Sequence, residues 1–182
     1  MLGIHQDIQE KVLEEIDTVF GDSNREVTLE DLPKLVYLEQ VIKETLRMWP
    51  PAAIILRNID EDVKLSNCIL PAGCTAALAA YALHMDEKIY PNPKKFDPSR
   101  FTPENIASRH KYSFLPFSGG PRSCIGSKYA MLSMKTTLSS FLRRYRVYST
   151  CKIEDIRLEL GLLMMSVDGY PVQIKERIPI VM

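Results

Sequence analysis

The chain has 182 residues, which fits one domain, and its 46% hydrophobic and 25% charged content is typical of a globular protein with a sizeable core. Lysine plus arginine equals aspartate plus glutamate at 23 each, so the overall charge does not indicate nucleic acid or an anionic membrane as the main partner. The four cysteines are too few and too scattered for a small disulfide scaffold, and the three histidines lack the spacing of a structural zinc site.

Two amphipathic helices are expected in the first third of the chain. Apolar residues at helical spacing predict the first from Gln6 to Phe20. A second is expected from about Leu35 to Trp49, because Pro50-Pro51 cannot continue a helix. The chain starts with neither a signal peptide nor a membrane-spanning segment, and we expect that it begins in mid-domain.

The remaining elements are shorter and more varied. Residues Ala52 to Tyr81 indicate short strands, whereas Tyr90 to Pro121 is rich in proline and aromatic residues and has no regular periodicity. A long helix is expected from about Ile125 to Arg146. The end is typical of a β-hairpin with strands from Leu158 to Met165 and from Tyr170 to Lys175. The predicted fold class is therefore mainly α with small β-sheets, an α+β arrangement.

One stretch carries a clear chemical signal: residues 117–126 read F-S-G-G-P-R-S-C-I-G. Cys124 lies where a glycine-rich loop meets a helix N-terminus, whose positive end and free N–H groups stabilise a thiolate. A thiolate held in this way can bind haem iron as an axial ligand. Gly120 and Gly126 allow a tight turn and close approach to a cofactor, Arg122 can reach a haem propionate, and Phe117 can keep water off the sulfur. The alternative is a buried, inert cysteine.

The stretch matches F-x-x-G-x-R-x-C-x-G, the haem-binding signature of the cytochrome P450 family, at all five fixed positions. Glu44 and Arg47 match the family's E-x-x-R motif, in a helix that ends at a proline pair. Residues 96–101 resemble its proline-x-arginine-phenylalanine segment, with Ser99 where glutamate is more usual. The three motifs occur in the family's order. The resemblance implies a buried charge triad of Glu44, Arg47 and Arg100 behind the haem.

The resemblance also implies the C-terminal part of the P450 fold, incomplete, with the E-x-x-R helix at 35–49 and the haem-ligand loop and following helix at 117–146. Haem b is the implied cofactor, and Cys124 is the implied metal ligand. Arg57 occupies the place of a second propionate-binding arginine, although a surface arginine on a strand is the alternative. The implied substrate-pocket residues, for which plain core packing is the alternative, are Ala53, Ile54, Ile55, Leu162 and Leu163.

The implied reaction is insertion of one oxygen atom from O2 into a lipophilic substrate, with electrons from NADPH through NADPH–cytochrome P450 reductase and cytochrome b5 as a further partner. The implied location of a full-length parent is the cytosolic face of the endoplasmic reticulum membrane. The stretch around Cys124 looks closest to the microsomal branch that includes fatty-acid hydroxylases. Docking of the reductase is expected on one side of the long helix, with a solvated face as the alternative, near Lys128, Lys135, Arg143 and Arg146.

We find no motif for the family's N-terminal anchor or for its distal helix, which holds the acid–alcohol pair of oxygen activation. No catalytic residue is therefore assigned, and the histidines are given no role. A truncated, inactive fragment or a haem-free interaction module is the main alternative to a monooxygenase. A thiol-based redox protein using Cys124 is disfavoured, because no resolving cysteine is near it in sequence.

Overall fold

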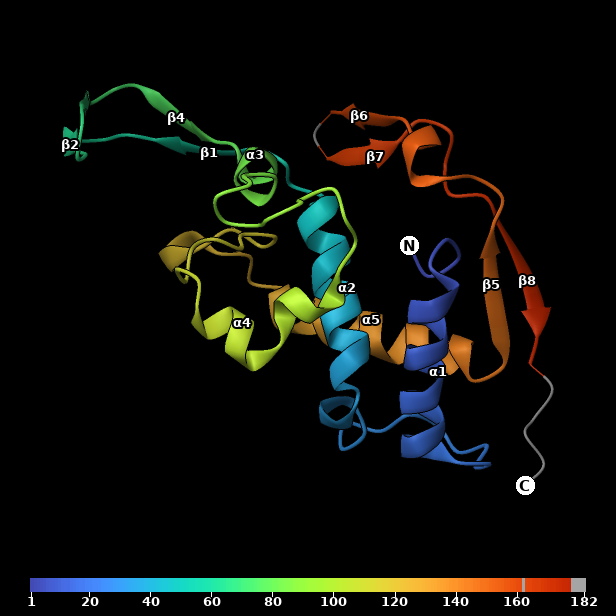
Figure 1. The fold of residues 1–182 in the computed structure, drawn as a ribbon. Coiled ribbons are helices and arrows are strands. Elements are labelled where there is room, and N and C mark those ends of the chain that lie inside the picture. Colours follow the sequence, from blue (N-terminus) through green and yellow to red (C-terminus); the bar gives the residue numbers. More distant parts are fainter. Residues whose placement is uncertain (162, 178–182) are drawn as a thin grey trace.

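The computed structural model describes residues 1–161 and 163–177, and three helices form its main body (Figure 1). They are α1 (Gln6–Phe20), α2 (Val36–Met48) and α5 (Ser127–Leu142). The shorter helical elements are α3 (Ala80–His84), α4 (Pro103–Ala107), η1 (Leu32–Lys34), η2 (Pro98–Phe101), η3 (Gly120–Arg122) and η4 (Ile153–Asp155). The first two predicted helices are confirmed, the first with the same bounds.

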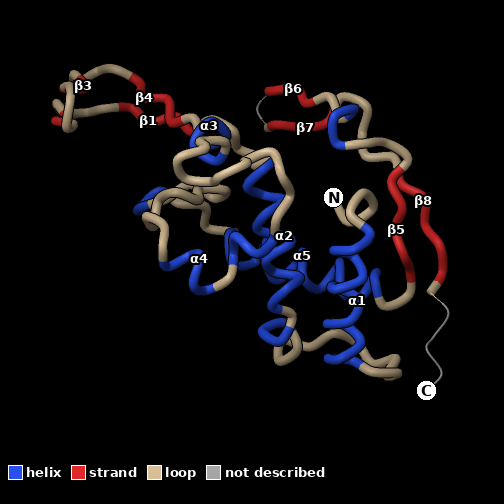
Figure 2. Tube along the Cα trace, in the orientation of Figure 1, coloured by secondary structure: helices blue, strands red, loops and turns tan. Residues whose placement is uncertain are grey.

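The strands pair in two-stranded antiparallel sheets at the periphery of the helices (Figure 2). The pairs are β1 (Ile55–Asn58) with β4 (Thr75–Leu78), β2 (Val63–Lys64) with β3 (Ile69–Leu70), β5 (Tyr145–Ser149) with β8 (Val172–Glu176), and β6 (Leu158–Leu160) with β7 (Met164–Ser166). The β1–β4 arm extends away from the helices in Figure 1. Helices with small sheets confirm the predicted α+β class and are consistent with an incomplete P450 fold.

The prediction for the C-terminal strands is wrong in its pairing. The segment from Leu158 to Ser166 is itself a hairpin, β6–β7, while β8 pairs with β5. A turn does occur at the expected place, because Gly169 has a φ of 71° and Asp168 forms an ion pair with Arg157. That turn redirects the chain from one sheet to another instead of closing a hairpin, since each flanking strand finds a partner elsewhere.

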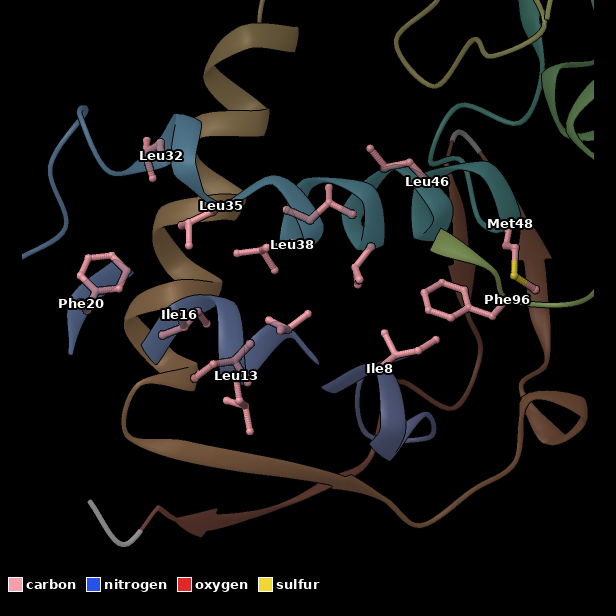
Figure 3. Close-up of a cluster of buried hydrophobic side chains, with 14 residues drawn as sticks. Ile8, Leu13, Ile16, Phe20, Leu32, Leu35, Leu38, Leu46, Met48 and Phe96 are labelled. Carbon is pink, nitrogen blue, oxygen red and sulfur yellow. The ribbon is translucent and has the colours of Figure 1, made fainter. Parts of the chain in front are cut away.

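The hydrophobic core lies where α1, α2 and α5 meet (Figure 3). Helix α1 contributes Leu13 and Ile16, and α2 contributes Leu38 and Leu46, all of which are buried. Leu13 and Ile16 are three positions apart, and Leu38 and Leu46 are eight apart. Both spacings keep the two residues on the same side of their helix, so each helix presents one apolar side to the others. Burial of this apolar side holds the helices that carry the two main motifs in a single packed body.

A carboxylate on α1 accepts hydrogen bonds from the free N–H groups in the first turn of α2. Glu15 accepts hydrogen bonds from the backbone N–H groups of Tyr37 (2.6 Å) and Leu38 (2.9 Å). The first N–H groups of a helix have no partner within the helix, and the positive end of its dipole favours an anion there. Helix α2 is thus capped by tertiary contact and not by its own preceding residue.

The buried side chain of Gln9 attaches α1 to β5. Its Nε2 donates to the carbonyl oxygens of Val147 (2.7 Å) and Leu2 (2.9 Å), and its Oε1 accepts from the N–H of Val147 (2.9 Å). The carboxamide therefore satisfies both backbone groups of Val147, as a neighbouring strand would do. This contact secures the strand that follows α5 to the first helix of the chain.

Candidate functional site

Cys124 lies in a loop between η3 and α5 that is held at several points. Its backbone N–H donates to the carbonyl oxygen of Phe117 (2.9 Å), and the N–H of Ser123 donates to the carbonyl of Gly120 (3.0 Å). Ser118 and Gly120 have φ values of 64° and 74°, in the left-handed region, which turns the loop sharply. The Cys124 side chain is exposed. The loop thus presents one accessible sulfur just before the first turn of α5.

Arg57 reaches this loop from β1. Its Nη2 donates to Ser118 Oγ (2.8 Å) and lies 3.3 Å from the carbonyl oxygen of Arg122, which also accepts a hydrogen bond from it. The Arg122 side chain makes no hydrogen bond or ion pair with any of the residues that the structure describes. The Arg57 guanidinium, from a distant part of the sequence, therefore binds the same loop that carries Arg122 and Cys124.

The surroundings of Cys124 suit a broad apolar cofactor with anionic substituents. Ile125 and Tyr129 are 104% and 76% exposed, so uncovered apolar surface follows the sulfur along the chain. At Gly126 an added Cβ would lie 3.8 Å from Cys124 Sγ, an ordinary van der Waals distance, so Gly126 borders the sulfur directly. One soft sulfur ligand, neighbouring apolar surface and two arginines match the chemistry of haem and its propionates.

The three predicted charges lie together, on α2 and η2. Glu44 and Arg47 are fully buried, and their bidentate pair has N–O distances of 2.7 Å and 2.9 Å. Arg100 Nε lies 3.5 Å from Glu44 Oε1 as an ion pair without hydrogen-bond geometry. Arg100 Nη2 instead donates to the carbonyls of Pro91 and Asn92 at 2.7 Å and 3.0 Å. The cluster therefore attaches the proline-rich segment that begins at Tyr90 to α2.

His84, Tyr90, Pro93 and Arg109 complete this cluster, and no pattern in the sequence indicated a role for them. Arg47 donates to the carbonyl oxygens of His84 (2.8 Å) and Pro93 (2.6 Å). Two guanidinium groups lie over the buried Tyr90 ring, with Cζ 5.1 Å from its centroid for Arg47 and 4.9 Å for Arg109. Cation–π contacts of this kind stabilise a desolvated charge. Proline and aromatic enrichment indicated a packed segment, but no local pattern indicates which ring meets which cation.

The model of the family described as "Cytochrome P450" matches residues 1–173 of the chain. The chain belongs to the cytochrome P450 family. It is 48% identical over 179 residues to "Cytochrome P450 4g15" of Drosophila melanogaster and 44% identical over 177 residues to "Cytochrome P450 4V2" of Homo sapiens. These alignments cover 97% of the chain and 31% and 34% of the relatives, so the chain spans about a third of their length.

An apolar cavity of about 390 Å³ lies between the segment after α2 and the β6–β7 hairpin of this P450 chain. Ala53 and Ile54 line it, together with Leu158, Leu160 and Met164 from the hairpin. The Met164 N–H donates to the Pro51 carbonyl (2.8 Å) and holds the hairpin in place. The described lining does not include two of the predicted pocket residues, Ile55 and Leu163, and Leu162 lies outside the described residues.

The prediction that the last long helix reaches Arg146 and carries its cations on one exposed side is wrong for this P450 chain. Helix α5 ends at Leu142, and Arg146 lies in β5, where it pairs with Glu10 at 2.5 Å. The helix ends early because the aromatic and β-branched residues of β5 favour a strand that can pair with β8. Of the described residues, no helix is both long and apolar enough to cross a membrane.

The buried side of α5 carries polar residues that were expected on its surface. Lys135 and Ser139 are buried, and Lys135 Nζ lies 2.8 Å from Glu39 Oε2 on α2. The Arg143 guanidinium donates to the carbonyls of Ser23 and Arg25. The lysine stem packs as an apolar chain while its ammonium group is neutralised by a carboxylate. Lys135 is therefore a packing residue, whereas Lys128 is exposed.

We expect Lys135→Ala to lower the free energy of unfolding by about 1–3 kcal/mol, because it removes buried methylene groups and an ion pair. Glu39 keeps its partner Lys43 at 2.6 Å and is half-buried, which limits the loss. Lys128→Ala, at an exposed position of the same helix, should change stability by less than about 0.5 kcal/mol. Denaturant unfolding of both variants of the full-length protein tests this. Unchanged stability with weaker reductase binding in Lys135→Ala would restore the docking role.

Proposed function

We propose that this chain forms the thiolate side of a haem monooxygenase site, with Cys124 as the axial ligand to the iron of haem b. The observation that carries the proposal is an exposed cysteine in a hydrogen-bonded loop that includes Arg122 and binds the Arg57 guanidinium. Arg57 and Arg122 bind the two propionates, since charge-assisted hydrogen bonds to guanidinium groups are strong and directional. When bound, haem supplies the oxygen activation, and a thiolate ligand favours O–O cleavage.

The residues around Cys124 position and shield the sulfur. Phe117 is half-buried against the helical core, and its carbonyl accepts the Cys124 N–H. Its ring limits the access of water to the thiolate, and Gly120 and Gly126 let the backbone lie close to the porphyrin. The triad of Glu44, Arg47 and Arg100 supports this side of the site from behind. These roles preserve the geometry of a single sulfur ligand, and none of them is an acid–base step.

The proposed reaction inserts one oxygen atom from O2 into a lipophilic substrate. Electrons come from NADPH through NADPH–cytochrome P450 reductase, with cytochrome b5 as a second donor, at the cytosolic face of the endoplasmic reticulum membrane. Lys128 is the exposed cation of α5 that we retain for docking. Ala53, Ile54 and the β6–β7 hairpin border the substrate, because their cavity is apolar. We place the substrate in the class of fatty-acid-like molecules.

The spectrum of the haem-loaded, full-length gene product that carries this chain tests the proposal. After reduction and addition of carbon monoxide, we expect the strongly red-shifted Soret band of thiolate ligation. Oxidation of a long-chain fatty acid should depend on both NADPH and the reductase. Haem loading without the red-shifted band would overturn the ligand assignment, and a red-shifted band without any oxidation of such acids would overturn the substrate class.

The second proposal is that residues 1–182 by themselves are not a competent monooxygenase. Cys124 and Ile125 are exposed, whereas ligand sites normally bury most of a cofactor's surface. Val172 and Ile174 on β8 are also about half exposed, and a chain with such uncovered apolar surface favours association over a defined monomer.

We expect residues 1–182 with added hemin to show no stable thiolate-type carbon-monoxide spectrum and no sharp thermal transition. Absorption spectroscopy and calorimetry of the same sample provide the measurements. The full-length gene product, prepared in parallel, is the matched control for haem loading. A cooperative transition together with reductase-dependent substrate oxidation by residues 1–182 would contradict the prediction, and would make this segment a self-sufficient enzyme domain.

A further inference from the structure

His84, the last residue of α3, is a fully buried histidine that links two parts of the site. Its Nδ1 lies 3.1 Å from the carbonyl oxygen of Arg47, and its Nε2 lies 2.8 Å from the backbone nitrogen of Leu115. A backbone N–H can only donate, so Nε2 must be unprotonated and must accept this hydrogen bond. The proton is then on Nδ1, which donates to the Arg47 carbonyl. The two contacts together select one neutral tautomer.

The surroundings of His84 favour this neutral state. Burial lowers the pKa of His84 to about 4; the hydrogen bond to the Arg47 carbonyl opposes the shift, and the Arg47 charge adds to it. The charge that faces the ring from α2 is that of Arg47, which is paired with Glu44. From the following segment the Phe114 ring packs on the imidazole, with 5.4 Å between the ring centroids. Arg47 Nη1 also donates to the His84 carbonyl (2.8 Å), so the link is reciprocal.

The Leu115 end of this link leads directly into the ligand loop. Its carbonyl accepts from the Ser118 N–H (3.3 Å), which closes the turn that contains Phe117. The Phe117 carbonyl in turn accepts the N–H of Cys124 (2.9 Å). A short series of backbone contacts therefore runs from the imidazole of His84 to the residue that carries the sulfur.

We propose that His84 is a positioning residue for the iron ligand: its imidazole joins the end of the E-x-x-R helix to the entrance of the ligand loop and thereby fixes the place of Cys124. The proposal rests on the proposed role of Cys124 as the haem ligand. His84 itself touches neither the sulfur nor a substrate. It acts through Leu115 and Phe117, because a displaced turn moves the hydrogen-bond acceptor on which the Cys124 backbone depends.

Three substitutions separate hydrogen bonding from packing. His84→Phe fills the space but offers the Leu115 N–H no acceptor. His84→Asn places an amide near the Nδ1 position, where it can donate to the Arg47 carbonyl but falls short of Leu115. His84→Gln extends an oxygen toward the Nε2 position and can accept from Leu115. If His84 only fills space, phenylalanine should be the best tolerated of the three. If His84 is a positioning residue, glutamine should be the best tolerated.

The test uses the full-length, haem-loaded gene product and two readouts. In His84→Phe and His84→Asn we expect hydrogen exchange at the Leu115 amide to be about tenfold faster, since one net hydrogen bond is lost. We also expect part of the reduced carbon-monoxide complex to shift from the thiolate-type to the thiol-type Soret band. His84→Gln should resemble wild type in both readouts. Wild-type exchange and spectrum in His84→Phe would overturn the proposal.

Nitrogen NMR of ¹⁵N-histidine-labelled protein keeps the proposal falsifiable if a variant fails to fold. At neutral pH, wild-type His84 should show a protonated Nδ1 and an unprotonated Nε2, and the opposite tautomer or an imidazolium would overturn the proposal. A failure of the proposal that Cys124 binds the haem iron would give a different result. Haem loading without a thiolate-type band in wild type removes Cys124 from the iron, while exchange at Leu115 and the tautomer still report on the His84 link.

Discussion

Replacing Cys124 with serine should abolish the red-shifted Soret band of the reduced, carbon-monoxide-bound protein. This is the largest effect that we expect from a single substitution, because a neutral hydroxyl is a poor replacement for a soft thiolate. The substitution is nearly isosteric at an exposed position, so the fold around the loop should persist. The Cys124 N–H contact to Phe117 involves only backbone and remains available. Absorption spectroscopy of the full-length, haem-loaded protein is the measurement.

Cys68→Ser is the matched control, because Cys68 is also exposed but lies beside the small β2–β3 sheet. It should retain the wild-type spectrum, and thermal unfolding should show that both variants are folded. A red-shifted band of undiminished intensity in Cys124→Ser would remove this residue from the iron. Loss of the band in Cys68→Ser as well would show that the spectrum reports general damage.

Glu44→Ala should abolish stable holoprotein and not merely reduce turnover. The carboxylate accepts from Arg47 at 2.7 Å and 2.9 Å and from the Asp97 N–H at 2.9 Å, and it is fully buried. Its removal leaves the Arg47 guanidinium desolvated without a counter-ion, which costs about 3–5 kcal/mol. A typical domain is stable by only roughly 5–15 kcal/mol. Arg100→Ala should act in the same direction, since Arg100 holds the carbonyls of Pro91 and Asn92.

The exposed pair of Arg157 and Asp168 provides a matched comparison. Its bidentate contacts of 2.8 Å and 2.5 Å resemble those of Glu44 and Arg47, but both side chains are more than half exposed. Asp168→Ala should leave haem loading and the melting temperature close to wild type, because water replaces the lost partner. Calorimetry and the haem-to-protein ratio of each variant give the answer. A folded, haem-loaded Glu44→Ala protein with wild-type melting temperature would refute the proposed triad.

The local sequence was sufficient to predict those elements that are specified by residues adjacent in the chain. Helix α1 has the predicted bounds because its apolar spacing and the glycine that follows act over neighbouring residues. Helix α2 ends before Pro50-Pro51 for a similarly local reason. The motif around Cys124 and the family resemblance likewise depend on residues adjacent in the chain, and the family is confirmed by the match over residues 1–173.

Contacts between distant residues decided the rest. The partner of β8 is β5 and not the adjacent β7, because backbone hydrogen bonds can be satisfied by any strand that the fold brings near. Lys135 is buried because Glu39 on another helix neutralises it, which a charge stripe along α5 alone cannot reveal. Arg57 meets the ligand loop, and His84 bridges Arg47 and Leu115, only after these segments pack together. The sequence by itself determined the first two helices and the candidate sulfur ligand, whereas tertiary structure decided what surrounds them, since burial and pairing depend on residues far apart in the chain.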